Sequence, residues 1–162
     1  MKFFIAGIMQ GSKTDLALHV QDYRQLIKES LSKAFPDAVV YDPFEYNKDS
    51  LTYNYKTGKK VFLAHNRMCG TEIDVLVAFV PEATMGTAIE LWEAWQNGAV
   101  ILTISSMTTN WVVNFLSDLI FPDIASFQTA IASGAVTEEI ERRAPRSFRR
   151  FIENNGEIKF IK

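Results

Sequence analysis

The sequence predicts one α/β domain in which helices cover both faces of a parallel sheet of about five strands. The chain has 162 residues, which fits a single domain at roughly 150 residues per domain. Short apolar runs alternate with longer amphipathic segments, and this alternation is typical of parallel sheets with crossover helices. The apolar runs are nearly continuous, as in strands that are buried on both faces. No internal repeat or low-complexity linker divides the sequence, so we assign residues 1–162 to one domain.

The first half of the chain contains two predicted strands and two predicted helices. Apolar residues at helical spacing predict the first helix, which Pro36 ends. The polar, aromatic-rich stretch before the second helix predicts a loop of the length that often carries function. The expected elements are strand 2–8, turn 11–15, helix 16–35, strand 38–41, loop 42–58 and helix 61–72.

The second half contains the most apolar of the predicted strands, residues 74–80, which we expect at the centre of the sheet. Gly98 stands where a helix would end in a C-cap glycine. The expected elements are strand 74–80, loop 81–86, helix 87–97, strand 99–104, helix 110–120, a short helix 125–132, a charged helix 138–153, and a last strand or docked tail at 158–161.

The composition excludes several classes of protein. With 48% hydrophobic and 22% charged residues, the chain is not of the disordered type. The net charge of −2 provides no basic field for a nucleic-acid polymer or an anionic membrane. No apolar run approaches the roughly 20 residues of a membrane span, and the N-terminal run is too short for a signal peptide. The cytoplasm is therefore the expected location.

Metal and thiol chemistry are not expected either. The single cysteine, Cys69, excludes an intrachain disulfide and a cysteine-rich zinc site. The two histidines, His19 and His65, are far apart in the sequence, so we expect no metal and no cofactor. His65 and Cys69 lie four residues apart and are interpreted as helix residues, not as a base and a nucleophile. In the charged helix, acidic residues precede basic ones, which indicates a solvated helix rather than a nucleic-acid patch.

The segment after the first strand is a candidate ligand-binding turn, because ligands of parallel sheets bind beyond the carboxyl ends of the strands. Two glycines four residues apart, Gly7 and Gly11, would let the backbone approach a ligand, and Ser12 adds a hydroxyl group. The sequence is neither a P-loop nor a G-x-G-x-x-G fingerprint. A tight turn without a ligand is the other interpretation.

Glu90, after the third strand, has two possible roles. At 100° per residue it lies about 150° from the centre of the apolar stripe of its helix, so it points away from the core. Thr87 and Glu90 have the spacing of a capping box, which is the structural interpretation. The chemical interpretation makes Glu90 a reactive carboxylate. Asp74, at the start of the third strand, is expected at the end of the sheet opposite the ligand crevice.

The run from Asp74 to Leu91 resembles the signature of the nucleoside 2-deoxyribosyltransferase family. The signature is an aspartate, an apolar strand, a loop, and Gly-x-x-x-Glu at the opening of a helix, here Gly86 to Glu90. The turn from Gly7 to Gly11 is similar to that family as well, and the likeness covers about residues 2–119. The resemblance implies a flavodoxin-like or Rossmann-like three-layer αβα sandwich. It also implies chemistry at the N-glycosidic bond of a nucleoside or nucleotide, in nucleotide metabolism or salvage.

The resemblance also implies roles for particular residues. Glu90 would attack the anomeric carbon of the sugar, and Asp74 would lie in the site and orient the base or the nucleophile. A homodimer or higher homo-oligomer is implied, with Asn114 entering the neighbouring subunit's site; the apolar helix 110–120 suits such an interface. The substrate-binding residues would be Gly7, Met9, Gln10, Gly11, Ser12, Thr84, Gly86 and Asn114.

The sequence leaves two possible acceptors for the sugar, water or a second nucleobase, which correspond to two branches of the family. Thr84 stands where transferases carry an aspartate and monophosphate hydrolases a serine, which favours transfer to water and a 5′-monophosphate substrate. Gln10 replaces an arginine that hydrolases often have, and Ile5 replaces a tyrosine of the transferases. Transfer to a second nucleobase therefore remains the other branch. A non-catalytic nucleotide-binding or sensor protein of the same fold is the alternative from another class.

Overall fold

A parallel sheet forms the centre of the protein in the computed structural model, which describes residues 1–15, 17–143, 151–154 and 157–160. The sheet has five strands in the order β2-β1-β3-β4-β5, which is the strand order of flavodoxin-like folds. This order confirms the predicted α/β class. The strands are β1 (Lys2–Gly7), β2 (Val39–Tyr41), β3 (Val75–Phe79), β4 (Val100–Ile104) and β5 (Leu119–Phe121).

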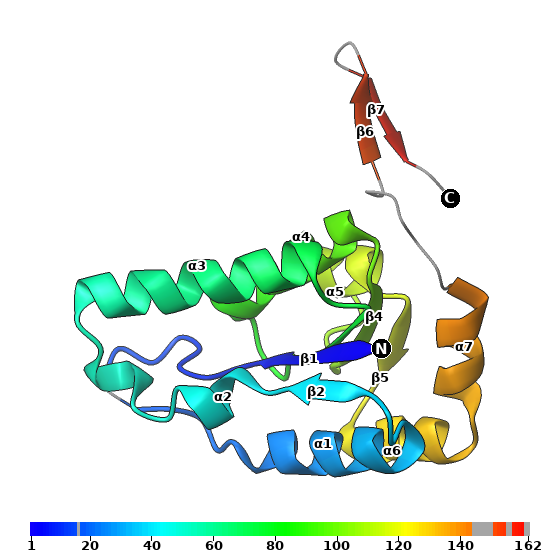
Figure 1. The fold of residues 1–162 in the computed structure, drawn as a ribbon, viewed down its shortest axis with the longest axis horizontal. Helices are drawn as coiled ribbons and strands as arrows, with labels where there is room; N and C mark the ends of the chain where they lie inside the picture. Colours follow the sequence, from blue (N-terminus) through cyan, green and yellow to red (C-terminus); the bar gives the residue numbers. More distant parts are fainter. Residues whose placement is uncertain (16, 144–150, 155–156, 161–162) are drawn as a thin grey trace.

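Helices cover both faces of this sheet (Figure 1), with α3, α4 and α5 on one face and α1 and α6 on the other. The helices are α1 (Asp22–Ala34), α2 (Pro43–Tyr46), the short 3₁₀ helix η1 (Ser50–Thr52), α3 (Tyr55–Thr71), α4 (Met85–Asn97), α5 (Trp111–Leu116), α6 (Ile124–Ala132) and α7 (Ala135–Arg143). In the part of the chain that the structure describes, no helix combines the length and the apolarity needed to cross a membrane.

Each face of the sheet has its own hydrophobic core, which explains why the strand sequences are continuously apolar. Successive side chains of a strand point to opposite faces. Phe3 and Ile5 therefore join the core beneath α1 and α6, while Phe4 and Ala6 join the core beneath α3 and α4. Burying a side chain of the size of Phe3 contributes about 2 to 3 kcal/mol, so both faces of β1 stabilise the fold.

The first helix begins later than predicted. Its first residue is Asp22, and the predicted start near residue 16 was wrong. Val20 is exposed, so the helical spacing of apolar residues did not correspond to a buried stripe there. The segment between β1 and α1 is instead a loop, in which the backbone N–H of His19 donates a hydrogen bond of 2.7 Å to the carbonyl of Met9. Leu16 lies outside the described residues.

The end of the chain also differs from the prediction. Helix α5 ends at Leu116, and residues Leu119–Phe121 form the fifth strand beside Leu102–Ile104 of β4, where a helix over 110–120 was expected. The charged helix ends at Arg143, and residues 144–150 lie outside the described residues. Strands β6 (Phe151–Asn154) and β7 (Glu157–Phe160) pair as an antiparallel hairpin. A terminal strand was thus predicted correctly, but it belongs to a separate two-stranded sheet.

Candidate functional site

A pocket with a volume of about 490 Å³ lies beyond the carboxyl ends of β1 and β3. This volume is within the range of about 300 to 1,000 Å³ that small-molecule sites occupy. Its walls come from the loop after β1, the segment between β2 and α3, helix α3 itself, and the N-terminal half of α4. The fold therefore places a cavity where parallel sheets bind their ligands.

Most residues expected at the site line this one pocket, although they come from segments more than 70 positions apart. They are Gly7, Met9, Gln10, Gly11, Thr84, Gly86 and Glu90. Asp74, Ser12 and Asn114 do not line it. Asn114 is exposed on α5.

Asp74 lies at the amino end of the sheet, away from the pocket. Its carboxylate accepts a hydrogen bond of 2.7 Å from the backbone N–H of Lys2, and its own N–H donates to the carbonyl of Lys2. The register that pairs Phe3 with Val75 fixes this position. The expectation from the strand pattern therefore agrees with the structure, and the position in the site implied by the resemblance does not.

Glu90 occupies the second turn of α4 and contributes to the pocket wall. Helix α4 begins at Met85, with Thr84 as the N-cap residue, and the N–H of Ala88 donates to the carbonyl of Thr84. Thr87 is consequently inside the helix and buried. The capping-box interpretation of Thr87 and Glu90 was wrong, because the helix starts earlier than its apolar stripe indicated.

The carboxyl group of Glu90 has a pKa raised to about 7. The main cause is burial, which disfavours the charged form, and the positive charge of Arg24 opposes the rise. A carboxylate of this kind is about half ionised at neutral pH. Such a group is suited to nucleophilic or acid–base chemistry, for which the optimal pKa lies near the working pH.

Gly7, which ends β1, and Gly11, in the loop after it, make room for protein side chains. A Cβ atom on Gly7 would lie 2.6 Å from the hydroxyl of Tyr23, and one on Gly11 would lie 2.7 Å from the carboxylate of Glu82. Gly11 also has a φ of +60°, a backbone conformation that residues other than glycine rarely adopt. The close approach of a ligand, on which the sequence interpretation relied, is therefore not needed to explain either glycine.

Two polar side chains of this loop, those of Gln10 and Lys13, are hydrogen-bonded within the loop. The amide of Gln10 donates to the carbonyl of Asp15 at 3.1 Å, and the ammonium of Lys13 donates to the carbonyl of Leu18 at 3.0 Å. Both groups hold the loop in shape.

Sequence reasoning missed the residues of the wall between β2 and α3. It expected a functional loop at 42–58 but assigned none of its residues to the site. The amide of Asn47 donates to the carbonyl of Pro43 at 2.8 Å, and the hydroxyl of Tyr53 donates to the side-chain oxygen of Asn47 at 3.2 Å. These bonds fasten the segment, and all three residues line the pocket.

His65 of α3 also lines the pocket, although the sequence indicated only a helix position. Its Nε2 lies 3.4 Å from the hydroxyl of Tyr41. Burial lowers the pKa of His65, and the charge of Arg24 lowers it further, so both favour the neutral imidazole. Among the described residues, no group of three or more histidines, cysteines or acids is arranged to hold a metal ion.

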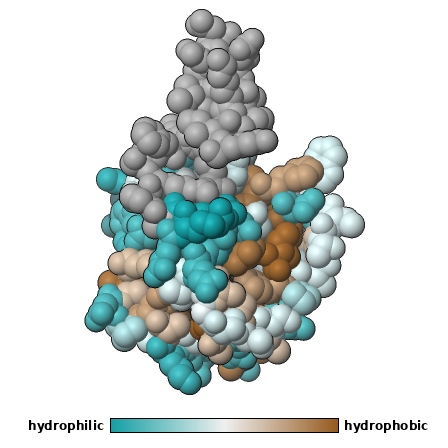
Figure 2. Space-filling model, turned by 90° about the vertical axis from the view of Figure 1, so that its right-hand side faces the viewer, coloured by the Kyte–Doolittle hydropathy of each residue, from teal (hydrophilic) through white to brown (hydrophobic). Residues whose placement is uncertain are grey.

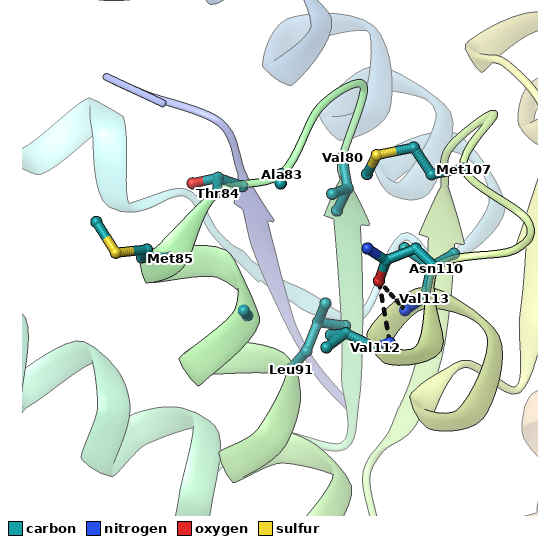
Figure 3. A pocket seen from close by; sticks show the side chains of 10 residues that line it. Val80, Ala83, Thr84, Met85, Leu91, Met107, Asn110, Val112 and Val113 are labelled. Carbon is teal, nitrogen blue, oxygen red and sulfur yellow. Dashed lines mark hydrogen bonds between the residues drawn. The ribbon is translucent and has the colours of Figure 1, made fainter. Parts of the chain in front are cut away.

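A second, smaller pocket of about 210 Å³ lies between α4 and α5 (Figure 3). Val80, Leu91 and Val113 form apolar walls, while Asn110 accepts hydrogen bonds from the backbone N–H groups at the start of α5. Thr84 and Met85 line both pockets. The N-terminus of α4 therefore stands between the two cavities.

Comparison with known proteins gives structural neighbours only. No protein-family model and no curated protein matches the sequence. A 2-deoxyribosyltransferase from the psychrotolerant bacterium Bacillus psychrosaccharolyticus matches with a TM-score of 0.56 and 15% identity, over 79% of this chain and 90% of that chain. This similarity establishes a shared fold and, at that level, confirms the resemblance and the αβα sandwich that it implied.

Two further structures match more weakly. A CMP N-glycosidase from Clostridium botulinum has a TM-score of 0.46 and 17% identity, over 82% of this chain and 99% of that chain. A conserved protein from Enterococcus faecalis has a TM-score of 0.49 and 18% identity, over 88% of this chain and 98% of that chain.

Proposed function

We propose that this protein cleaves the N-glycosidic bond of a (2′-deoxy)nucleoside, with Glu90 as the nucleophile. The observation that carries the proposal is a half-buried carboxyl group with a pKa of about 7 in the wall of a ligand-sized pocket. Attack by the Glu90 carboxylate on the anomeric carbon forms a C–O bond and breaks the C–N bond, and the departing base takes up a proton from solvent. Water then hydrolyses the glycosyl ester, and the two displacements together retain the configuration.

The charge of the pocket favours an uncharged nucleoside over a 5′-monophosphate. No lysine or arginine among the described residues lines the pocket. A phosphate group would bring a charge of about −2 near Glu90, and the carboxylate of Glu82 lies beside Gly11. Lys13, the nearest cation expected from the sequence, bonds to its own loop. These observations weigh against the monophosphate substrate that Thr84 favoured in the sequence.

Incubation of the protein with matched nucleosides and 5′-monophosphates tests this proposal directly. Free base, measured by chromatography, should appear with a kcat/KM at least about tenfold higher for the nucleoside, because one uncompensated phosphate contact is worth about 1.4 kcal/mol or more. Thr84→Ala should change kcat/KM by the same factor for both substrates. A preference for the monophosphate that Thr84→Ala abolishes would contradict the charge argument.

Two added measurements separate the alternatives. A new nucleoside formed after addition of a second free base would identify a transferase in place of a hydrolase. Calorimetric binding of nucleotides without release of base from any substrate would identify the non-catalytic nucleotide-binding protein.

Gly86 offers a test in which stability and activity are expected to change in opposite directions. A Cβ atom at this position meets no protein atom within 4 Å, and the residue lines the pocket in the first turn of α4. Gly86→Ala should therefore raise the free energy of unfolding by about 0.5 kcal/mol. If substrate approaches the backbone here, the same change should raise KM severalfold. An unchanged KM would remove Gly86 from the binding site.

We also propose that two copies associate through the exposed faces of α4 and α5. Figure 2 shows that apolar side chains gather on one part of the surface, and a large apolar patch on a water-exposed surface commonly marks an interaction site. Asn114 lies three residues after the exposed Trp111, so these two side chains share one face of α5. The exposed apolar residues of α4 and α5 are Met85, Ile89, Trp92, Trp111, Val112 and Phe115.

Mixing two inactive variants tests whether Asn114 completes the partner's site. Glu90→Gln and Asn114→Ala should each lower base release when pure. After mixing and exchange of subunits, activity should recover to about a quarter of wild type, since half of the dimers are hybrids and each hybrid has one intact site. A mixture as inactive as its components would rule out a shared site, and sedimentation of the wild type as a monomer would rule out the interface.

A further inference from the structure

Arg24 is a buried cation at the junction of the segments that form the pocket. Its side chain is only 3% exposed, and its guanidinium forms an ion pair of 2.8 Å with the equally buried Asp42. The same group donates hydrogen bonds to the carbonyls of Ile5 at 3.0 Å and Gly7 at 3.3 Å, at the end of β1. Its Nε donates to the side-chain oxygen of Gln21 at 2.8 Å. One guanidinium thus joins β1, α1 and the segment after β2.

Two of these connections, to Gly7 and to Asp42, lead to the pocket wall. Gly7 lines the pocket, and Asp42 directly precedes Pro43, which lines it too. The carboxylate of Asp42 also accepts a hydrogen bond from the N–H of Phe44 and so caps α2. A lysine could not replace these contacts, because only the planar fork of arginine presents donors in several fixed directions.

Arg24 also acts on the electrostatics of the pocket. Glu90 interacts electrostatically with Tyr23 and Arg24 of α1 and with Cys69 of α3. Asp42 forms the ion pair with Arg24. Arg24 lowers the pKa of Glu90, while Glu90 raises those of Tyr23 and Cys69. The other charged or titratable groups nearby are His65 of α3, whose pKa Arg24 also lowers, and Glu93 of α4, which acts on Cys69.

We propose that Arg24 is a positioning residue for Glu90: its guanidinium fixes the pocket wall by bonding β1 to the segment after β2, and its charge favours the ionised carboxylate that attacks the sugar. The inference rests on the proposed function of Glu90 as the nucleophile. Asp42 moderates the effect, since it neutralises much of the charge of Arg24 at a distance of 2.8 Å.

The test replaces the buried pair as a unit. Arg24→Met/Asp42→Asn removes both charges, keeps an asparagine at the cap of α2, and leaves no unpaired buried charge. The matched control is Lys28→Met/Glu45→Gln, which removes an ion pair between the same two segments, one turn further along α1 and partly exposed. Two properties are followed against pH: the ionisation of Glu90 by carboxyl ¹³C NMR, assigned with Glu90→Gln, and kcat and KM for base release.

The midpoint of the Glu90 titration should rise in Arg24→Met/Asp42→Asn, because the lowering effect of Arg24 is lost, and should stay unchanged in the control. The rise of kcat with pH should shift in parallel, with a loss at pH 7 larger than any change in KM. Asp42→Asn alone keeps the cation and removes its anion, so its midpoint should move below that of the wild type. This second variant also tests the inference if the double variant does not fold.

An unchanged Glu90 midpoint in the double variant, or an equal shift in the control, would overturn the inference. The failure of the proposed function has a different signature. If Glu90→Gln retains base release, Glu90 is not the nucleophile, whereas the NMR titration still reports whether Arg24 controls its ionisation.

Discussion

Glu90→Gln should reduce base release by roughly 10³-fold or more, because the amide cannot form the glycosyl ester that a carboxylate nucleophile forms. Glutamine has nearly the same shape, so binding of the nucleoside should be retained. The measurement is kcat/KM for base release in the wild type and the variant, together with the Kd of the nucleoside for the variant. A loss of kcat with a near-normal Kd is the expected result.

The same substitution should stabilise the protein at neutral and higher pH. Burial raises the pKa of Glu90 from 4.5 to about 7, so the folded state binds this proton more tightly than the unfolded state does. The contribution of Glu90 to stability is therefore fully present below pH 4.5 and is lost as the pH rises through 7. Glutamine has no such loss. The variant should gain up to about 3 kcal/mol over the wild type above pH 7 and little below pH 4.5.

Urea unfolding at pH 4.5 and pH 8 measures this difference. Glu93→Gln, one turn further along α4 and outside the pocket, is the matched control and should leave base release unchanged. A Glu90→Gln variant that keeps its activity would remove Glu90 from the mechanism. A variant that is less stable than the wild type at pH 8 would indicate a structural role for the carboxylate.

The central sheet could be predicted from sequence because its strands are buried on both faces. The side chains of strand β3 alternate between the two cores, with Val75 and Val77 in one and Leu76 and Ala78 in the other, so both faces require apolar residues, and a run of apolar residues is visible locally. The edge strand β5 has one neighbour, and Leu119 and Ile120 are only half buried. Leu119 and Ile120 were consequently assigned to the preceding helix.

The site was only partly predictable, for a related reason. Glu90 was found through a local motif, and its place in the pocket follows from the helix that carries it. Arg24 pairs with Asp42, 18 positions away, and such a contact depends on the tertiary arrangement of β1, α1 and α2. No spacing rule predicts it. Asp74 shows the opposite case. Its position at the start of a strand correctly predicted that it lies away from the pocket, whereas its position in the motif implied that it lies in the site.

Arg24→Met alone should be the most destabilising single change in the pocket region. It leaves the carboxylate of Asp42 buried without its cation and removes the hydrogen bonds to Ile5 and Gly7. Breaking a buried ion pair by removing one partner costs about 3 to 5 kcal/mol. The pair of Lys28 with Glu45 is partly exposed, so Lys28→Met should cost at most about 1 kcal/mol.

The double variant Arg24→Met/Asp42→Asn should recover most of the stability that Arg24→Met loses, because no uncompensated charge remains in the interior and asparagine still caps α2. Urea unfolding at pH 7 of the wild type, both single variants and the double variant gives the coupling energy between the two positions. We expect a coupling of about 2 kcal/mol or more, since the two groups share one buried network. Additive losses would mean that Arg24 stabilises the fold through its backbone hydrogen bonds alone. The role of its charge at Glu90 would then have to be judged from the titration of that carboxylate, which responds to charge and not to stability.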